Sequence, residues 1–434
     1  MIPYFSPSFL ALFDEDSTPL SSVMNYPQLS AASRADAGLV NHYLSHHIQE
    51  ILDIVLTDNT EPYVSTFINI LSFSVSDIFR AVLRGSRFSD MAAEILSDQK
   101  SSEKVISRLA TITLSLLINV PEEATKQCGF IYHLLKRINI NTVYDLFNTI
   151  LADDERCLPA RTWLHLFAFP EFILRELENI DYEGFESQEV VPYYDKTYSI
   201  TSALYVLIAK TTKTDTLKDD FLSPKAAKIL KKSFTHRPPN YVLNSRWKAI
   251  RCIVCEKNLE EFRPLFDEAI TILSEETKKL AEYHVNAIYF IISMIKLDQS
   301  LAQKAVDSKL PNWILGLVLQ FQNSSILHTA FRSFVTDLID IKPLGQNIID
   351  IYTPMLAESA RVKSNKVLRP TIFALIETIR DAATRNPEYA ESLRIIVEFG
   401  EICATEVPEY RTQSTMPYGG KMKSSLSDFF ANFL

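Results

Sequence analysis

The sequence predicts an all-α fold: an armadillo/HEAT-like α-solenoid, a superhelix built from paired helices. Three observations predict it: few glycines, apolar residues at helical spacing, and a recurrence near forty residues. The 434 residues include only 9 glycines, about a third of the number expected at average usage. Glycine supplies the positive φ angles and close backbone approaches that Rossmann, P-loop and hairpin-rich β folds require, so its scarcity counts against these classes.

Apolar residues recur at the spacing of an α-helix along the chain. Within Ile48–Leu56, Val75–Leu83 and Val143–Leu151 they fall at positions i, i+3, i+4, i+7 and i+8. This spacing gives each helix one apolar stripe, which only neighbouring helices can bury. Adjacent helix pairs recur about every forty residues, which is the period of HEAT and armadillo arrays.

Helix boundaries are marked by proline and by capping side chains more than by glycine. Thr18-Pro19, Ser223-Pro224 and Asn386-Pro387 each place a capping side chain before a proline at the first helical position. The missing N–H of proline costs nothing at that position. Gly345 is one of the few glycines predicted to lie in a connection between helices.

Four segments follow in chain order. Residues 1–180 are predicted to form N-terminal helical repeats, and residues 196–405 to form C-terminal helical repeats. Between them, residues 181–195 are acidic and contain one glycine and one proline, which predicts a connecting loop. Residues 406–434, with two prolines and two glycines, are predicted to form a loop followed by a terminal amphipathic helix.

Two adjacent blocks of opposite charge lie near the middle of the chain. Glu171 to Asp195 holds eight acidic residues and one arginine, and Lys196 to Arg251 holds twelve lysines or arginines and three aspartates. Such blocks usually form solvated faces or pair locally. The functional alternative is a basic ridge that binds an acidic segment of a partner.

Motifs that would indicate catalysis or metal binding are absent or incomplete. The single Cys-x-x-Cys, Cys252 to Cys255, has no second ligand pair at zinc-finger spacing, so packing in the core is the favoured interpretation. Asp153 to Glu155 lacks a further acid one turn on and is interpreted as a helix end. No nucleophile-elbow, P-loop or dinucleotide motif occurs. We therefore expect a non-enzymatic protein with no cofactor and no metal.

Charge and composition define the expected compartment and exclude some partners. A formal net charge of -9 gives no general attraction to nucleic acid. The apolar run Ala287 to Ile295 is far shorter than the roughly 20 residues that span a bilayer, so no membrane insertion is expected. The first residues lack the positive charge of a secretory signal, and five cysteines favour reduced thiols. The cytoplasm is the predicted location, with the nucleus left open.

An ordered series of segments between Leu20 and Ile180 carries a resemblance to a known family. Pro62–Ser72 (PYVSTFINILS) is similar to a family segment of the form Tyr-Pro-x-Val-Ala-x-Glu-Ile-Leu-Ser. Leu116–Glu123 and Leu134–Phe147 follow in the places of two further family helices, and Trp163-Leu164 opens the next. In these segments the chain resembles the SAPS domain, found in the regulatory subunits of type 6 serine/threonine protein phosphatase.

The resemblance implies an armadillo-like scaffold that binds a serine/threonine phosphatase catalytic subunit. Asp77 and Arg80 on one predicted helix, and Asp145 and Asn148 on another, are polar groups spaced i, i+3 between apolar positions. We expect these four residues to contact the partner. Asp145 is the first candidate because it occupies the place of the aspartate in the family's Met-Asp-Leu-Leu segment.

Two other functions stay open at the level of sequence. The first is an armadillo- or HEAT-type adaptor for another protein client, of the transport or chaperone type. The second is an all-helical enzyme whose catalytic residues are scattered along the chain. The expected function is a non-catalytic scaffold that binds and targets a serine/threonine protein phosphatase.

Overall fold

The structure is a computed structural model of the full chain, and it confirms the predicted all-α solenoid. It describes residues 5–13, 18–73, 75–180, 191–212, 217–234, 237–362 and 367–415. The chain is 79% helical, and none of the residues just named forms a strand. Contacts between residues divide the chain into two compact units, Met1–Ile253 (unit 1) and Val254–Leu434 (unit 2).

Unit 1 is a series of short helices. In chain order these are α1 Pro7–Leu10, η1 Ala11–Phe13, α2 Leu20–Val23, α3 Leu29–Arg34, α4 Gly38–His46, α5 Ile48–Val55, α6 Pro62–Phe73, α7 Ser76–Val82, α8 Arg87–Ser97, α9 Glu103–Asn119, α10 Pro121–Gln127, η2 Cys128–Phe130, α11 Ile131–Leu134, η3 Leu135–Arg137, α12 Asn141–Ile150, η4 Glu155–Cys157, α13 Leu158–Leu166, α14 Phe169–Glu178, α15 Val191–Thr211, α16 Lys218–Phe221, α17 Pro224–Leu230 and α18 Asn240–Ile253.

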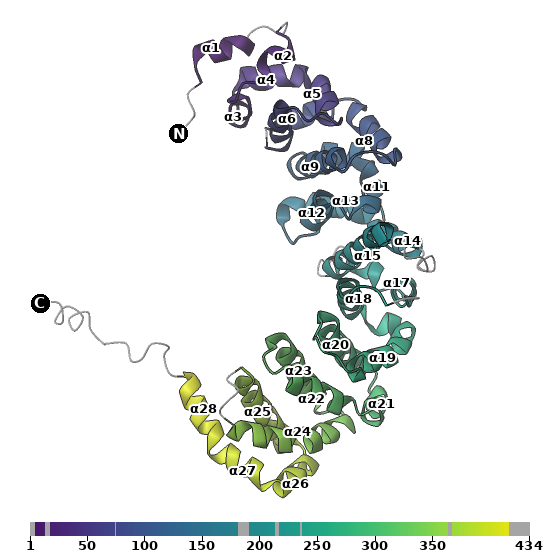
Figure 1. Ribbon diagram of the computed structural model, residues 1–434, viewed down its shortest axis with the longest axis vertical. Helices are drawn as coiled ribbons and strands as arrows, with labels where there is room; N and C mark the ends of the chain where they lie inside the picture. Colours follow the sequence, from purple (N-terminus) through teal and green to yellow (C-terminus); the bar gives the residue numbers. More distant parts are fainter. Residues whose placement is uncertain are drawn as a thin grey trace, which may run out of the picture. The chain divides into compact units, whose positions relative to one another are not determined.

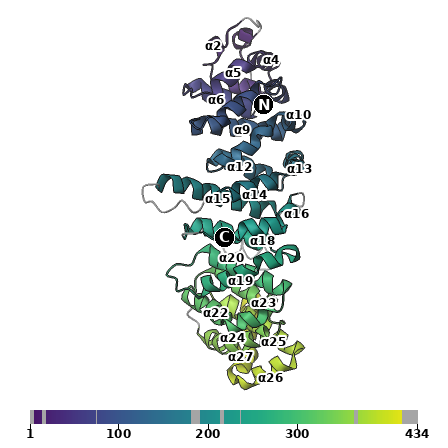
Figure 2. The same ribbon diagram turned by 90° about the vertical axis from the view of Figure 1, so that its right-hand side faces the viewer.

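The helices of unit 1 form two rows. In the first row α3, α6, α9, α12, α15 and α18 each contact the next, and in the second row α4 contacts α7, α10 contacts α13, and α14 contacts α17. Figure 1 shows α6, α9 and α12 following one another along one side of the unit, with α8, α11 and α14 along the other. The side view in Figure 2 keeps the order α6, α9, α12. This is the arrangement of a helical repeat array, in which each pair packs mainly on its neighbours.

The repeat is visible in the polar contacts as well as in the helix order. Ser102 hydrogen-bonds Asp58, and Gln127 hydrogen-bonds the backbone carbonyl of Leu83; in each case the partner lies 44 residues earlier. The first-row helices α6, α9 and α12 also begin close to forty residues apart. The period predicted from the pattern of apolar residues is therefore present in the structure.

The rows are held together by buried apolar stripes. In α9 the side chains of Val105, Ile106, Leu109 and Leu116 are buried, and Ser102 caps the helix by accepting a hydrogen bond from the backbone N–H of Val105. Between the rows, the fully buried ring of Phe147 on α12 stacks on Phe169 of α14, with ring centroids 5.4 Å apart. Burying one such side chain contributes about 1.5–3 kcal/mol.

Two of the three helix N-termini predicted from a capping residue followed by proline are confirmed, together with the hydrogen bond of the capping side chain. Ser223 accepts a hydrogen bond from the N–H of Ala226 at the start of α17, and Asn386 accepts one from Glu388 in unit 2. The third differs, because Pro19 itself is the capping residue of α2 and no side-chain cap is formed there.

Unit 2 repeats the two-row plan. Its helices are η6 Glu256–Asn258, α19 Leu259–Ser274, α20 Glu282–Leu297, α21 Leu301–Asp307, α22 Leu310–Gln320, α23 Ser325–Leu338, α24 Leu344–Arg361, α25 Arg369–Arg385, α26 Pro387–Ile395, α27 Val397–Ala404 and α28 Glu406–Thr415. One row contains α20, α23 and α25, and the other contains α19, α22, α24 and α27. Within this unit the aromatic ring of Tyr410 on α28 stacks on Phe373 of α25 at 4.4 Å.

Several predicted boundaries need correction. Residues 191–195, predicted as the end of the acidic loop, are the first turn of α15, with Pro192 at a position where its missing N–H is tolerated. Residues 181–190 lie outside the described residues. Residues 406–415, predicted as a loop, form α28, while the predicted terminal amphipathic helix lies outside the described residues. The division between units falls after Ile253, inside the segment 196–405 that was predicted as one block.

Candidate protein-binding surfaces

Asp77 and Arg80, two of the predicted partner contacts, lie on α7 in the second row. Both side chains are exposed. The guanidinium of Arg80 lies 3.7 Å from the Asp77 carboxylate, and its Nε donates a hydrogen bond to Oε1 of Glu123 on α10 at 3.3 Å. Exposed ion pairs of this kind contribute little to stability, so these three side chains remain available for contact with another molecule.

Asp145 and Asn148, the other two predicted contacts, lie on α12 in the first row. Asp145 is exposed. Burial, and secondarily the Asp145 charge, raises the pKa of its neighbour Tyr144. Asn148 is half-buried and accepts a hydrogen bond at its Oδ1 from Nζ of Lys210 on α15 at 2.6 Å. Its backbone carbonyl accepts a second hydrogen bond from the same ammonium.

The structure therefore does not gather the four predicted residues into one site. Asp77 and Arg80 pair with each other in the second row. Asn148 connects two first-row helices, and Asp145 stands on the exposed stripe of α12. Sequence spacing identified which residues share a helix, but it could not assign each helix to a row.

A polar stripe runs along the exposed side of the first row. Its members are spaced i, i+4 on their helices and are exposed or half-buried; we define this first-row face by Ser65 and Asn69 on α6, Thr111 and Ser115 on α9, and Asp145 on α12. The hydroxyls of Thr111 and Ser115 donate hydrogen bonds to backbone carbonyls one turn earlier. The face is therefore mostly uncharged, and Asp145 is its charged member.

The predicted basic ridge of residues 196–251 is largely engaged within the chain. Lys225 forms an ion pair with Glu171, and Lys232 donates to the backbone carbonyl of Glu178. Arg246 is only 1% exposed and donates hydrogen bonds to the carbonyls of Leu230 and Lys231 at the end of α17. Local pairing, one of the two interpretations drawn from the sequence, describes these residues.

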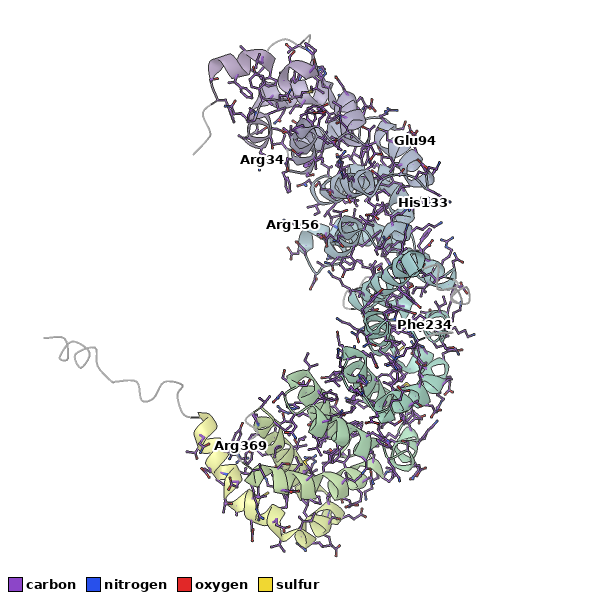
Figure 3. All side chains as sticks on the ribbon, in the orientation of Figure 1. Arg34, Glu94, His133, Arg156, Phe234 and Arg369 are labelled. Atoms are coloured by element: carbon purple, nitrogen blue, oxygen red, sulfur yellow. The ribbon has the colours of Figure 1, made fainter. Side chains whose placement is uncertain are left out.

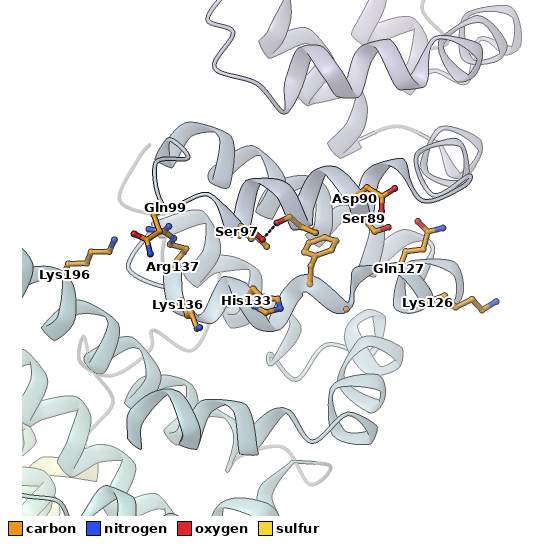
Figure 4. Close-up of a pocket in the computed structure, with 14 residues that line it drawn as sticks. Ser89, Asp90, Ser97, Gln99, Lys126, Gln127, His133, Lys136, Arg137 and Lys196 are labelled. Atoms are coloured by element: carbon orange, nitrogen blue, oxygen red, sulfur yellow. Dashed lines mark hydrogen bonds between the residues drawn. The ribbon is translucent and has the colours of Figure 1, made fainter. Parts of the chain in front are cut away.

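A groove with basic walls lies instead in the second row. It has a volume of about 940 Å³ and lies between α8 on one side and the segment from α10 to η3 on the other. We call it the basic groove; its basic lining residues are Lys126, His133, Lys136, Arg137 and Lys196, with Asp90 the acidic one. Figure 4 shows Lys136, Arg137 and Lys196 at one end, His133 near the middle, and Lys126 and Asp90 at the other end. Figure 3 places His133 and Glu94 on the side of unit 1 opposite Arg34 and Arg156.

The basic groove was missed at the level of sequence. Its four cations come from α10, η3 and α15, and three of them fall in the short stretch from Lys126 to Arg137. That stretch follows the acidic Glu122-Glu123 pair, so its net charge is small when counted in a wider window. Counting basic residues over a shorter window of the sequence would have found the cluster.

The motifs considered for chemistry form no metal site in the part of the chain that the structure describes. No group of three His, Cys, Asp or Glu side chains there is placed to hold a metal ion. Cys252 and Cys255 are half-buried, not fully buried as core packing would require. Asp154 caps η4, and its hydrogen bonds from Arg156 lower the pKa of its carboxyl. The helix-end interpretation of Asp153 to Glu155 describes this geometry.

None of the described helices has the length and apolar composition needed to cross a membrane.

No family model matches the chain, and no curated protein matches it in sequence. Among solved structures, the chain is similar to an engineered protein determined by a structural genomics consortium. The alignment has 10% identity and a TM-score of 0.42 and covers 93% of this chain and 97% of the other. At this TM-score the likeness supports no conclusion about fold or function, and the all-α solenoid rests on the helices themselves.

Proposed function

We propose that the chain is a non-catalytic scaffold that binds a protein partner on the first-row face of unit 1. The observation that carries this proposal is that three successive first-row helices, α6, α9 and α12, each present exposed or half-buried polar side chains. Repeat arrays use such extended faces for protein recognition. A stable interface needs roughly 800 Å² from each partner, an area that requires several neighbouring helices.

The partner we propose is a serine/threonine protein phosphatase catalytic subunit of type 6. Support for this choice comes from the resemblance of residues 20–180 to the SAPS domain. The same residues form the helices α2 to α14 of unit 1, so the resembling segments and the first-row face belong to one array. Asp145 is the charged residue of the first-row face, and it lies within the resembling segment Leu134–Phe147.

The proposal assigns different roles to the two residues on α12. Asp145 is exposed and charged, so it is proposed to contact a basic group of the phosphatase. Asn148 already accepts two hydrogen bonds from Lys210, so its contribution is to hold α12 against α15. A loss of binding on changing Asn148 would therefore come with a loss of stability.

The test is a pull-down of purified type 6 catalytic subunit by the tagged chain. Asp145→Lys is expected to abolish retention without lowering the melting temperature, because the side chain is exposed. Asp77→Lys, which makes the same charge change on the second row, is the matched control and is expected to retain the phosphatase. Retention by both variants removes Asp145 from the interface, and failure of the unaltered chain to retain the phosphatase rejects this partner.

An adaptor for another protein client is the second candidate, and it is favoured by the same first-row face without the phosphatase assignment. Mass spectrometry of proteins that co-purify with the chain separates the two. A stoichiometric phosphatase catalytic chain supports the first proposal. A different stoichiometric protein whose retention depends on Asp145 supports the adaptor.

A further inference from the structure

The basic groove gathers positively charged side chains from several helices of unit 1. Four of its lining residues, Lys126, Lys136, Arg137 and Lys196, carry full positive charges, and Asp90 carries the negative charge. Among the residues that the structure describes, no carboxylate lies within ion-pair distance of Lys136 or Arg137. Asp90 itself accepts a hydrogen bond from Ser86 at 2.7 Å. The arrangement is therefore a local excess of cations on a chain with a net charge of -9.

We propose that the basic groove binds an extended acidic peptide segment of a partner protein. This goes beyond the proposed phosphatase scaffold, because the groove lies in the second row and the proposed phosphatase contact lies in the first. A cationic groove raises the local concentration of an anionic ligand and strengthens its binding through charge complementarity. The planar fork of Arg137 can hold a carboxylate through two parallel hydrogen bonds.

The placement of the charges favours an elongated ligand over a single small anion. Lys136, Arg137 and Lys196 lie at one end of the groove, whereas Lys126 lies at the other (Figure 4). One phosphate or carboxylate cannot contact both ends of an open groove of about 940 Å³. A peptide can extend across it and place an acidic side chain at each end.

The two ends of the groove also differ in charge, and this difference would set the direction in which an acidic peptide binds. Asp90 stands near Lys126 and repels a second carboxylate there, whereas none of the described lining residues at the three-cation end is acidic. We therefore expect the most acidic part of the peptide at Arg137. The amide of Gln99 beside Arg137 and the imidazole of His133 near the middle of the groove can donate hydrogen bonds to the peptide backbone.

The lining does not favour single-stranded nucleic acid. Proteins that bind single strands usually stack bases on exposed aromatic rings along a cationic track. The aromatic residue of this groove, Phe130, is only 8% exposed and packs its ring on Phe88 at 5.7 Å. The groove therefore supplies charge but little ring surface for stacking, and an acidic peptide needs only the charge.

The test measures binding of a fluorescein-labelled acidic peptide to the purified full chain by fluorescence anisotropy. The peptide is twelve residues of Glu, Asp, Ser and Gly, and its comparison replaces every Glu and Asp by Gln and Asn. We expect the acidic peptide to bind at 50 mM salt, to weaken as salt rises, and to bind at least about tenfold more tightly than the neutral peptide. Equal affinity for the two peptides would overturn the proposal.

Charge-reversal variants locate the site. Lys136→Glu with Arg137→Glu is expected to weaken binding by about tenfold or more. Lys126→Glu with Lys196→Glu changes only exposed side chains, so it tests the groove even if the first pair lowers stability. The control, Lys278→Glu with Lys279→Glu, makes the same charge change at exposed residues of unit 2 and is expected to leave binding unchanged. An equal loss in the control would mean that only net charge matters, which rejects the groove.

A labelled twelve-nucleotide single strand tests whether the groove prefers nucleic acid to an acidic peptide. We expect the strand to bind more weakly than the peptide. A strand that binds more tightly, and depends on Lys136 and Arg137, would assign the groove to nucleic acid and overturn the proposal. The phosphatase plays no part in these measurements. Peptide binding with no phosphatase retention would therefore leave the groove assigned and reject only the proposed scaffold partner.

Discussion

Nζ of Lys210 on α15 donates a hydrogen bond to Oδ1 of Asn148 on α12 at 2.6 Å, joining two residues 62 positions apart in the sequence. The same ammonium also contacts the backbone carbonyl of Asn148. A first-row helix is thus connected to the next by one lysine. The contact gives Asn148 a structural role and leaves Asp145 as the exposed polar residue one turn away.

Asn148→Ala should destabilise unit 1 by about 1 kcal/mol, because Lys210 loses its side-chain acceptor but retains the carbonyl. Asp145→Ala, on the same helix but exposed, should change stability by less than about 0.5 kcal/mol. Urea titration followed by circular dichroism measures both. Equal effects from the two changes would show that the contact with Lys210 adds no stability.

Gly345 should be intolerant of any side chain. It is the second residue of α24 and buried, not in a connection as predicted, and an added Cβ would overlap the carbonyl oxygen of Ile339 and the hydroxyl of Tyr389. That hydroxyl donates a hydrogen bond to the same carbonyl at 2.9 Å, so neither atom can move freely. Gly345→Ala should therefore cost about 3 kcal/mol.

The matched control for this change is Gly316→Ala in the middle of α22. No heavy atom lies within 4 Å of its added Cβ, and alanine favours helix by up to about 1 kcal/mol over glycine. Gly316→Ala should raise the melting temperature and Gly345→Ala should lower it. A melting temperature that is unchanged in Gly345→Ala would contradict the close approach of α24 and Ile339.

Arg161 should be important for stability although it forms no ion pair with a described residue. Its side chain is 5% exposed, and Nη1 donates to the carbonyls of Ile150, Ala152 and Asp154 at the end of α12. Arg161→Met fills a similar volume but leaves these carbonyls without their donor, so we expect a loss of about 2–3 kcal/mol.

Arg156→Met is the control for Arg161→Met, because Arg156 lies in the same connection and its side chain is 76% exposed. Its pairing with Asp154 is at the surface, so the urea midpoint should not move measurably. If the two variants unfold at the same urea concentration, the hydrogen bonds of Arg161 to the carbonyls do not stabilise the end of α12.

His328 should make unit 2 sensitive to acid. The side chain is 4% exposed on α23, and its burial lowers the pKa of the imidazole below the ordinary value. The folded state therefore favours the neutral ring. This contribution to stability is present above the unfolded pKa of about 6.5, and it is lost as the pH falls through the lower folded pKa.

Thermal melts between pH 7.5 and pH 5 measure this dependence. His328→Gln should flatten the fall in melting temperature toward acid. His42→Gln, at an exposed position on α4, should leave the slope as it is in the unaltered chain. If His328→Gln retains the full acid dependence, other groups are responsible for it.

Part of the candidate surface could be predicted from the sequence, and part could not. The i, i+3 spacing correctly placed Asp77 with Arg80 and Asp145 with Asn148 on shared helices, because helical geometry is local. The ion pair of Arg80 with Glu123 and the hydrogen bonds of Lys210 to Asn148 join residues 43 and 62 positions apart. Periodicity within one helix carries no information about such partners.

The amino-acid sequence by itself determined the construction of this protein. Apolar stripes at helical spacing, a period near forty residues and a shortage of glycine dictate helices that can be buried only against other helices. Only the tertiary structure decided which helix joins which row. That assignment depends on packing between residues about one repeat apart. It places Asp145 on an exposed face and Asn148 beside Lys210, and it brings Lys196 to the groove lined by Lys136 and Arg137.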